Sequence, residues 1–178
     1  MAKNKYAADY RLIEEFDEKG RVHVSTEYIG AEYRYAGDEA QMKRRRRSVL
    51  CLLAAGWVIY LAALIPYSQL MHSVRIVLPY VLSAVPLGIF TEFFLSLGGQ
   101  KEKLEHRFAD RIANDWPALM AAGMACTGLS AVFALAGLIR LPERLPGDWI
   151  GAAAAVLLFL VFREIFGRRH GFAAEKQA

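Results

Sequence analysis

The sequence predicts an all-α integral membrane protein with four transmembrane helices, arranged as two helical hairpins, and a small cytoplasmic β-hairpin near the N-terminus. Three observations lead to this prediction. The 178 residues are 55% hydrophobic and 22% charged, whereas a soluble domain averages about 45–50% apolar residues. The apolar residues gather in four long blocks separated by strongly polar stretches. The segment before the first block alternates between apolar and polar residues, which is typical of strands.

The N-terminal segment, residues 1–47, is expected to contain this β-hairpin. Residues 10–16 alternate in part and residues 22–28 alternate fully, while Asp-Glu-Lys-Gly at 17–20 is a turn signal. After Gly30 the alternation changes phase, which favours a β-bulge there. A lone two-stranded hairpin is marginally stable in water. We therefore expect it to be covered by the membrane domain, a second copy or a protein partner; the alternative is a poorly ordered tail.

A run of five basic residues ends this segment. Such a run can bind nucleic acid, but directly before a transmembrane helix it is typical of a topology determinant that contacts anionic lipid. We therefore predict contact with the lipid bilayer and no nucleic-acid partner. The residues concerned are Lys43, Arg44, Arg45, Arg46 and Arg47.

The four apolar blocks form two predicted transmembrane hairpins, residues 48–98 and 117–167. Asp, Glu, Lys and Arg are absent from the centres of the first, third and fourth blocks, and residues 76–98 of the second contain only Glu92. About 20 apolar residues cross the hydrocarbon core as a helix, in which every backbone polar group is paired internally. Pro86 predicts a kink in the second helix. We expect the helices at about residues 48–68, 75–98, 117–139 and 148–167.

The flanks of these helices predict their orientation. Twelve Lys and Arg residues flank the helices on the side of the termini, and three on the other side. Cytoplasmic loops carry the excess of basic residues. We therefore expect a multi-pass protein of the cell membrane with both termini cytoplasmic.

Residues 99–116 join the two hairpins and are predicted to form a cytoplasmic amphipathic helix. Its apolar residues recur every four positions, as on one face of a helix. The helix would pack under the bundle, lie on the membrane surface or cover the β-hairpin. Residues 168–178 would form a cytoplasmic tail. The apolar positions of the linker helix are Leu104, Phe108, Ile112 and Trp116.

Glu92 is the most conspicuous polar residue within the predicted membrane helices. An ionised carboxylate there is costly and is a functional candidate. Arg163 lies at a similar depth from the cytoplasmic end of the fourth helix and is followed by Glu164, so an intramembrane ion pair is a candidate. The alternative is a solvated carboxylate and an arginine that reaches the interface.

Small residues predict close packing of the third and fourth membrane helices. A stripe of small side chains lets two helix backbones approach each other. Whether a second copy also joins there, as a homo-oligomer, is left open by the sequence. The candidate packing residues are Ala118, Ala122, Cys126, Ser130 and Ala134 in the third helix, and Gly151 and Ala155 in the fourth.

No catalytic, cofactor-binding or metal-binding residues are predicted. The four histidines are scattered, and phosphate-binding, dinucleotide-binding and metal-ligand motifs are missing. We therefore expect not an enzyme but a non-catalytic accessory or interaction subunit of a membrane complex, with a protein partner bound through the β-hairpin. The alternative is a small oligomeric transporter or channel that uses Glu92 and Arg163.

Overall fold

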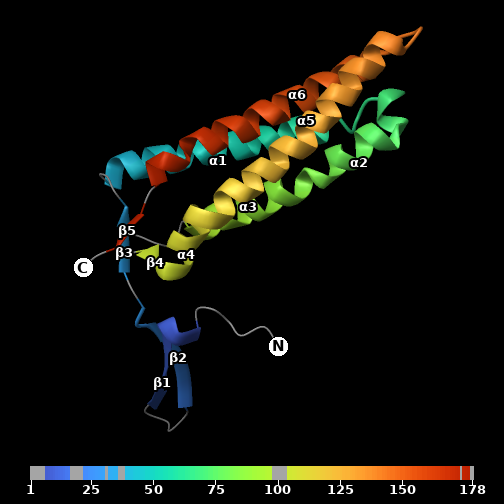
Figure 1. Ribbon diagram of the computed structural model, residues 1–178. Helices are drawn as coiled ribbons and strands as arrows, with labels where there is room; N and C mark the ends of the chain where they lie inside the picture. Colours follow the sequence, from blue (N-terminus) through green and yellow to red (C-terminus); the bar gives the residue numbers. More distant parts are fainter. Residues whose placement is uncertain are drawn as a thin grey trace.

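A computed structural model of the chain shows a bundle of long helices with two small β-sheets at one end (Figure 1). The first long helix runs away from the sheets, the chain returns through two shorter helices, and the last two long helices repeat this path. The chain therefore enters and leaves the bundle at the sheet end. The structure describes residues 7–16, 22–30, 32–35, 39–97, 104–172 and 174–176.

The regular elements follow the order of the chain. The helices are η1 (Ala7–Asp9), α1 (Glu39–Ala62), η2 (Leu70–His72), α2 (Val74–Leu82), α3 (Ala84–Ser96), α4 (His106–Asp110), η4 (Arg111–Asp115, a π-helical turn), α5 (Trp116–Arg140), α6 (Pro146–Gly167) and η5 (Arg168–Phe172). The strands are β1 (Tyr10–Phe16), β2 (Val22–Tyr28), β3 (Glu32–Tyr35), β4 (Leu104–Glu105) and β5 (Ala174–Lys176).

Three helical stretches among the described residues are long and apolar enough to cross a membrane: Val74–Ser96, His106–Arg140 and Pro146–Phe172. The mostly helical, membrane-like fold class predicted from the sequence is therefore supported.

The α1 helix differs from the prediction because it begins within the polar segment and ends at Ala62 instead of residue 68. Its apolar part has fifteen residues, or about 22 Å of rise. Pro66 lies shortly after this end and disfavours helical backbone at Ile65, directly before it.

The second apolar block forms two helices, α2 and α3, which meet at Ser83. The interruption lies three residues before Pro86, where the sequence predicts the kink. Pro86 has no N–H to donate to the preceding turn, and its ring crowds a carbonyl there. The Ser83 hydroxyl donates to the Tyr80 carbonyl at 2.6 Å and so satisfies one backbone acceptor at the junction.

The predicted linker helix is continuous with the third membrane helix. Helical structure begins at His106 and continues through the π-helical turn into α5. Phe108, Ile112 and Trp116 are buried on one face, as expected, but Leu104 lies in a strand. The π-helical turn ends two residues before Pro117, which cannot donate a backbone hydrogen bond. Residues 99–103 of the predicted linker, and residue 98 at the end of the first predicted hairpin, lie outside the described residues.

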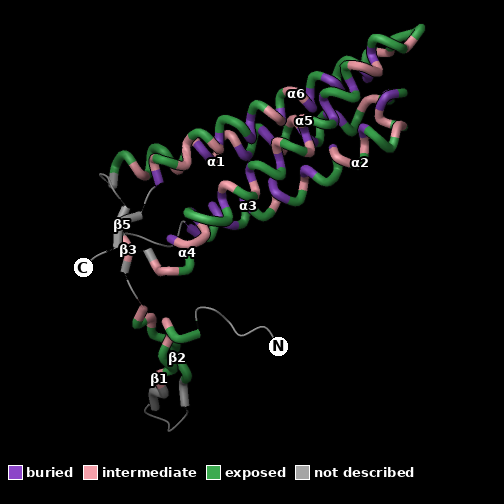
Figure 2. The backbone as a smooth tube through the Cα atoms, in the orientation of Figure 1, coloured by how far each residue is buried: buried purple, intermediate pink, exposed green. Residues whose placement is uncertain are grey.

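The bundle has an aromatic core at the sheet end and a second core further along, in which alanines pack with a pair of tyrosines and a leucine. At the sheet end the Trp116 ring lies 5.0 Å from Phe90 and 5.1 Å from Phe172. Further along, Ala131 and Ala155 belong to a second buried cluster. The most extensive helix–helix contact is between α5 and α6. Figure 2 shows the buried residues along the inside of the bundle and exposed residues around its outside.

The predicted β-hairpin is confirmed: β1 and β2 are antiparallel, with Tyr10 opposite Tyr28 and Phe16 opposite Val22. The predicted turn at 17–20 lies outside the described residues. The expected bulge at Gly30 is wrong, because the ladder is regular and ends at Tyr28.

A second sheet, which the sequence did not predict, has the strand order β4–β3–β5. Tyr33 in β3 lies opposite Leu104 in β4 and Lys176 in β5. The C-terminal segment predicted as a tail therefore contributes a strand, held by pairing with a segment near the other end of the chain.

Candidate functional site

The root of the β-hairpin meets the start of α4 in a group of polar and aromatic side chains, which we call the joint: Asp9, Tyr10, Tyr28, Gly30, Tyr33, Glu105 and His106. The Tyr10 hydroxyl donates to Glu105 Oε2 at 2.6 Å. The backbone N–H of His106 donates to the Tyr28 hydroxyl at 2.8 Å. These contacts join residues far apart in the sequence and attach the hairpin to the end of the bundle.

Ion pairing and ring contacts complete the joint. His106 Nδ1 lies 3.2 Å from Asp9 Oδ2, an ion pair when the imidazole is protonated. The Tyr33 and His106 rings stack at 5.7 Å. Gly30 allows the close approach of these groups, because a Cβ there would lie 2.7 Å from the Tyr28 hydroxyl and 2.8 Å from Asp9 Cβ.

The surroundings of Tyr10 and Tyr28 in the joint favour the protonated, neutral form of both side chains. Burial, followed by the hydrogen bond to Glu105, raises the pKa of Tyr10 to about 12. Burial also raises the pKa of Tyr28. Both hydroxyls therefore keep their protons at neutral pH, and Tyr10 can act as a hydrogen-bond donor to the Glu105 carboxylate.

Beyond the joint, the hairpin projects away from the bundle (Figure 1). Leu12 and Val24, which lie on the same face of the two-stranded sheet, are 70% and 61% exposed. Ile29 is 58% exposed. The described bundle therefore leaves an apolar face of the hairpin uncovered. Exposed apolar faces of this kind are typical of interaction surfaces, and a free strand edge can pair with another chain.

The candidate ion pair residues lie on the outside of the bundle. Glu92 is exposed on α3, and Arg163 and Glu164 are exposed on α6. Within the part of the chain that the structure describes, no ion pair joins Glu92 to Arg163. Glu164 instead accepts a hydrogen bond from Arg168 Nη2 at 2.8 Å, one turn further along the same helix.

The predicted packing residues fall into two groups. Ala118 and Ala122 are exposed and Cys126 is half-buried, whereas the others are buried. Sequence reasoning missed Gly123, which lies directly against the Phe162 ring. The signal available was the glycine itself, in a helix interior where glycine is unfavourable unless packing requires it. The buried members of the predicted set are Ser130, Ala134, Gly151 and Ala155.

The basic run lies in the first turns of α1, not in a loop. Lys43, Arg44, Arg45 and Arg47 are exposed, and Arg46 is half-buried. Arg45 Nη1 donates to the Gly171 carbonyl at 2.7 Å and so connects α1 with η5. The run thus lies at the sheet end of the bundle, beside the C-terminal part of the chain.

Polar side chains inside the bundle donate to neighbouring helices. Ser130 Oγ donates to the Ile76 carbonyl at 2.9 Å, and the Tyr80 hydroxyl to the Tyr60 carbonyl at 3.1 Å. Trp57 Nε1 donates to Thr91 Oγ1 at 3.1 Å. Interhelical hydrogen bonds of this kind hold membrane helices together.

Asp148 is a buried carboxylate that the sequence analysis missed. It accepts hydrogen bonds from the Ser68 hydroxyl at 2.8 Å and from the backbone N–H groups of Leu70 and Leu145 at 3.1 and 2.9 Å. It therefore fixes the α1–α2 connection to the start of α6. The signal available was Pro146 at the first helical position followed by an acidic residue in the first turn.

Comparison with protein-family models, with curated proteins and with solved structures gives no match to this chain. In the described part of the chain, no three His, Cys, Asp or Glu side chains gather where they could hold a metal ion.

Proposed function

We propose that this chain is a multi-pass protein of the cell membrane and a non-catalytic subunit of a membrane complex, which binds a protein partner through its β1–β2 hairpin. One observation carries the proposal: the hairpin projects beyond the bundle with Leu12 and Val24 exposed. An isolated two-stranded hairpin is marginally stable in water. A protein that covers this face would remove the exposed apolar area and stabilise the strands.

Membrane insertion is supported by the outer surface of the bundle. Because lipid replaces water around a membrane domain, large apolar residues are tolerated on its outside. We propose α1 as a fourth crossing, since it runs along the bundle in contact with α3 and α6. Its short apolar part would be accommodated by local thinning of the bilayer or by basic side chains reaching the interface. Exposed apolar residues include Val58, Leu61, Leu78, Val85, Leu129, Val132, Leu135 and Leu157.

The distribution of charge supports a cytoplasmic sheet end. The run 43–47, Arg168 and Arg169 belong to helix ends close to the sheets, while Arg75, Arg140 and Arg144 lie towards the opposite end. Basic residues concentrate on the cytoplasmic side. The hairpin, the joint and both termini would then face the cytoplasm, where a soluble domain of a partner could reach them.

The experiment is purification from native membranes in a mild detergent, followed by mass measurement of the intact particle. We expect a stoichiometric second protein with the wild-type chain. The double variant Leu12→Ser with Val24→Ser should lose it. The matched control, Arg11→Gln with Glu27→Gln, changes a cross-strand pair on the opposite face and should retain it. A clean monomer or homo-oligomer from wild-type membranes would overturn the proposal.

A second candidate function is a small oligomeric transporter or channel. The observation that favours it is the exposure of Glu92 and Arg163 on two apolar helices, where a second copy could reach them. Intramembrane charged residues often serve transport. Under this alternative, Glu92→Gln abolishes ion flux in proteoliposomes while insertion is normal. The accessory-subunit proposal expects no flux in either protein.

A further inference from the structure

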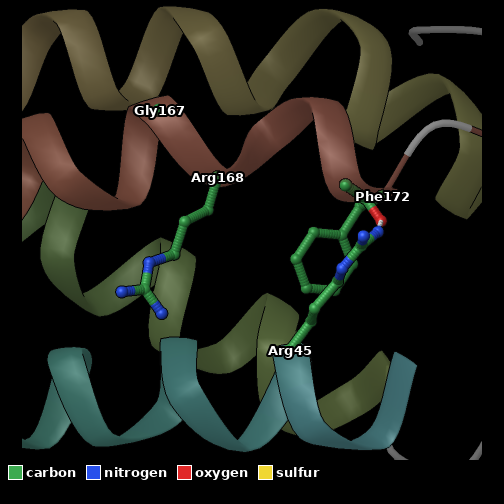
Figure 3. Close-up of a pocket in the computed structure, with 5 residues that line it drawn as sticks. Arg45, Gly167, Arg168 and Phe172 are labelled. Atoms are coloured by element: carbon green, nitrogen blue, oxygen red, sulfur yellow. Dashed lines mark hydrogen bonds between the residues drawn. The ribbon is translucent and has the colours of Figure 1, made fainter. Parts of the chain in front are cut away.

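A cavity of about 240 Å³ lies between the start of α1 and the end of α6, at the sheet end of the bundle. It is lined by Arg45, Gly167, Arg168, Gly171 and Phe172. Figure 3 shows Arg45 extending from α1 beside the Phe172 ring, and Arg168 extending from the other helix towards α1. Two guanidinium groups from different segments of the chain therefore line one half-open space.

The two arginines keep donors for a ligand. Arg45 has one described hydrogen bond, from Nη1 to the Gly171 carbonyl at 2.7 Å. Arg168 donates from Nε and Nη2 to Glu164 Oε1 at 3.1 and 2.8 Å, and from Nη1 to Ser48 Oγ. A guanidinium carries five N–H donors. Arg45 therefore retains most of its donors, while Arg168 retains fewer and is partly neutralised by Glu164.

The surroundings of the cavity are strongly basic. Arg44 and Arg46 flank Arg45 in sequence, and Arg169 follows Arg168. Glu164 is the acidic residue paired with Arg168 in this region. The local charge therefore attracts an anion, and the fork of a guanidinium matches the oxygens of a phosphate group.

The position of the cavity also suits a ligand at a membrane surface. In α1 the basic run ends at Arg47 and the apolar part begins at Ser48. In α6 the apolar stretch ends just before Arg163, and Arg168 directly follows the last residue of this helix, Gly167. Phe172 is buried against the cavity. Polar headgroups and acyl chains meet at a boundary of this kind.

We propose that this cavity binds the phosphate group of an anion at the membrane surface, with Arg45 as the main ligand and Arg168 as the second. The proposal does not depend on the protein partner proposed above. The shared chemistry is a phosphate group, which an anionic phospholipid headgroup or free inorganic phosphate can supply. A diffuse attraction between the basic run and an anionic bilayer is the competing explanation, and it makes a different prediction for single substitutions.

The experiment uses the full-length protein in a zwitterionic detergent and follows its thermal stability as a ligand is added. The probes are phosphatidylglycerol, phosphatidylcholine and inorganic phosphate. We expect saturable stabilisation by phosphatidylglycerol and little by phosphatidylcholine. Stabilisation by inorganic phosphate at millimolar concentration would show that free phosphate also occupies the site. Stabilisation by phosphatidylglycerol alone would assign the site to the lipid headgroup. Stabilisation by neither anion would overturn the proposal.

Matched variants separate a site from diffuse attraction. One basic residue near an anionic membrane contributes roughly five-fold in affinity, so diffuse attraction predicts an equal, roughly five-fold loss for Arg45→Gln and Arg44→Gln. If the anion binds in the cavity, Arg45→Gln should lower the affinity by well above five-fold. Arg44→Gln should lower it less, because Arg44 does not line the cavity. Equal losses would overturn the proposal.

A charge-neutral variant provides a second, independent test. A Cβ at Gly171 would lie 2.9 Å from Arg45 Nη1 and 3.2 Å from its Cδ and Cζ, so Gly171→Ala should displace the flexible end of Arg45. We expect weaker binding with unchanged net charge. The control is Gly88→Ala in α3, which does not line the cavity and whose added Cβ would meet nothing closer than Trp57 Cζ2 at 3.9 Å, so its binding should be unchanged. Unchanged binding in Gly171→Ala would contradict a site built around Arg45.

Discussion

The helical bundle and the β-hairpin are held in place by different interactions. Within the bundle, α5 and α6 are in intimate contact, and Ser130 and Tyr80 donate to carbonyls of neighbouring helices. The hairpin is fixed at its root by the joint, while Leu12 and Val24 remain exposed. We therefore expect the bundle to fold without the hairpin, whereas the hairpin is positioned by a few hydrogen bonds and ring contacts.

This difference predicts that substitutions can lower the stability of the bundle and the docking of the hairpin independently of each other. Proteins open in cooperative units of unequal stability, and units with few buried contacts open first. Substitutions in the α5–α6 contact should destabilise the bundle. Substitutions in the joint should release the hairpin and leave the bundle folded.

The largest effect is expected for Gly123→Leu. Even a Cβ at Gly123 would overlap the buried Phe162 ring, and a leucine adds more atoms. Overpacking of this kind costs about 1–3 kcal/mol. We expect a lower thermal unfolding temperature of the protein in detergent. The control Ala122→Leu places the same side chain at an adjacent, exposed position and should change the stability little. Equal stability of the two variants would contradict the described α5–α6 contact.

The small-residue stripe shows how far sequence alone could predict this contact. Successive positions four residues apart drift by about 40° around an α-helix. A strict spacing of four from Ala118 to Ala134 therefore turns by about 160° and cannot stay on one face. Accordingly, Ala118 and Ala122 are exposed, while Ser130 and Ala134 are buried. The sequence predicted close packing of two helices. Which face of each helix forms the contact also depends on how the two helices cross.

The sheets show a second limit. Alternation within residues 10–28 predicted β1 and β2, because the pairing is local. The pairing of Tyr33 with Lys176 joins the two ends of the chain, and no local pattern reports it. The same holds for the joint, where Tyr10 meets Glu105. A short polar segment such as residues 174–176 becomes a strand only because the fold brings it beside β3.

An intermediate effect is expected for Gly30→Leu in the joint. The added side chain would collide with the Tyr28 hydroxyl and with Asp9, so the hydrogen bond from His106 to Tyr28 should be lost. One such bond contributes about 1 kcal/mol. We expect faster proteolysis and faster hydrogen exchange in β2, with an unchanged unfolding temperature of the bundle. A parallel loss of bundle stability would show that the hairpin and bundle fold as one unit.

The smallest effect concerns the titration of Tyr10. Burial and the bond to Glu105 raise its pKa from 10.0 to about 12, so the folded joint holds this proton more tightly than the unfolded chain does. Its contribution to docking is therefore fully present below pH 10 and is lost as the pH rises through about 12. The phenolate absorbance of the wild type minus that of Tyr10→Phe should show a midpoint near 12. In Glu105→Gln the midpoint should fall only part of the way, because burial is the larger cause. A wild-type midpoint near 10 would mean that Tyr10 does not contact Glu105 and that the hairpin is not docked on the bundle. The hairpin would then be a freely moving segment, and the contrast between a stable bundle and a docked hairpin would be wrong.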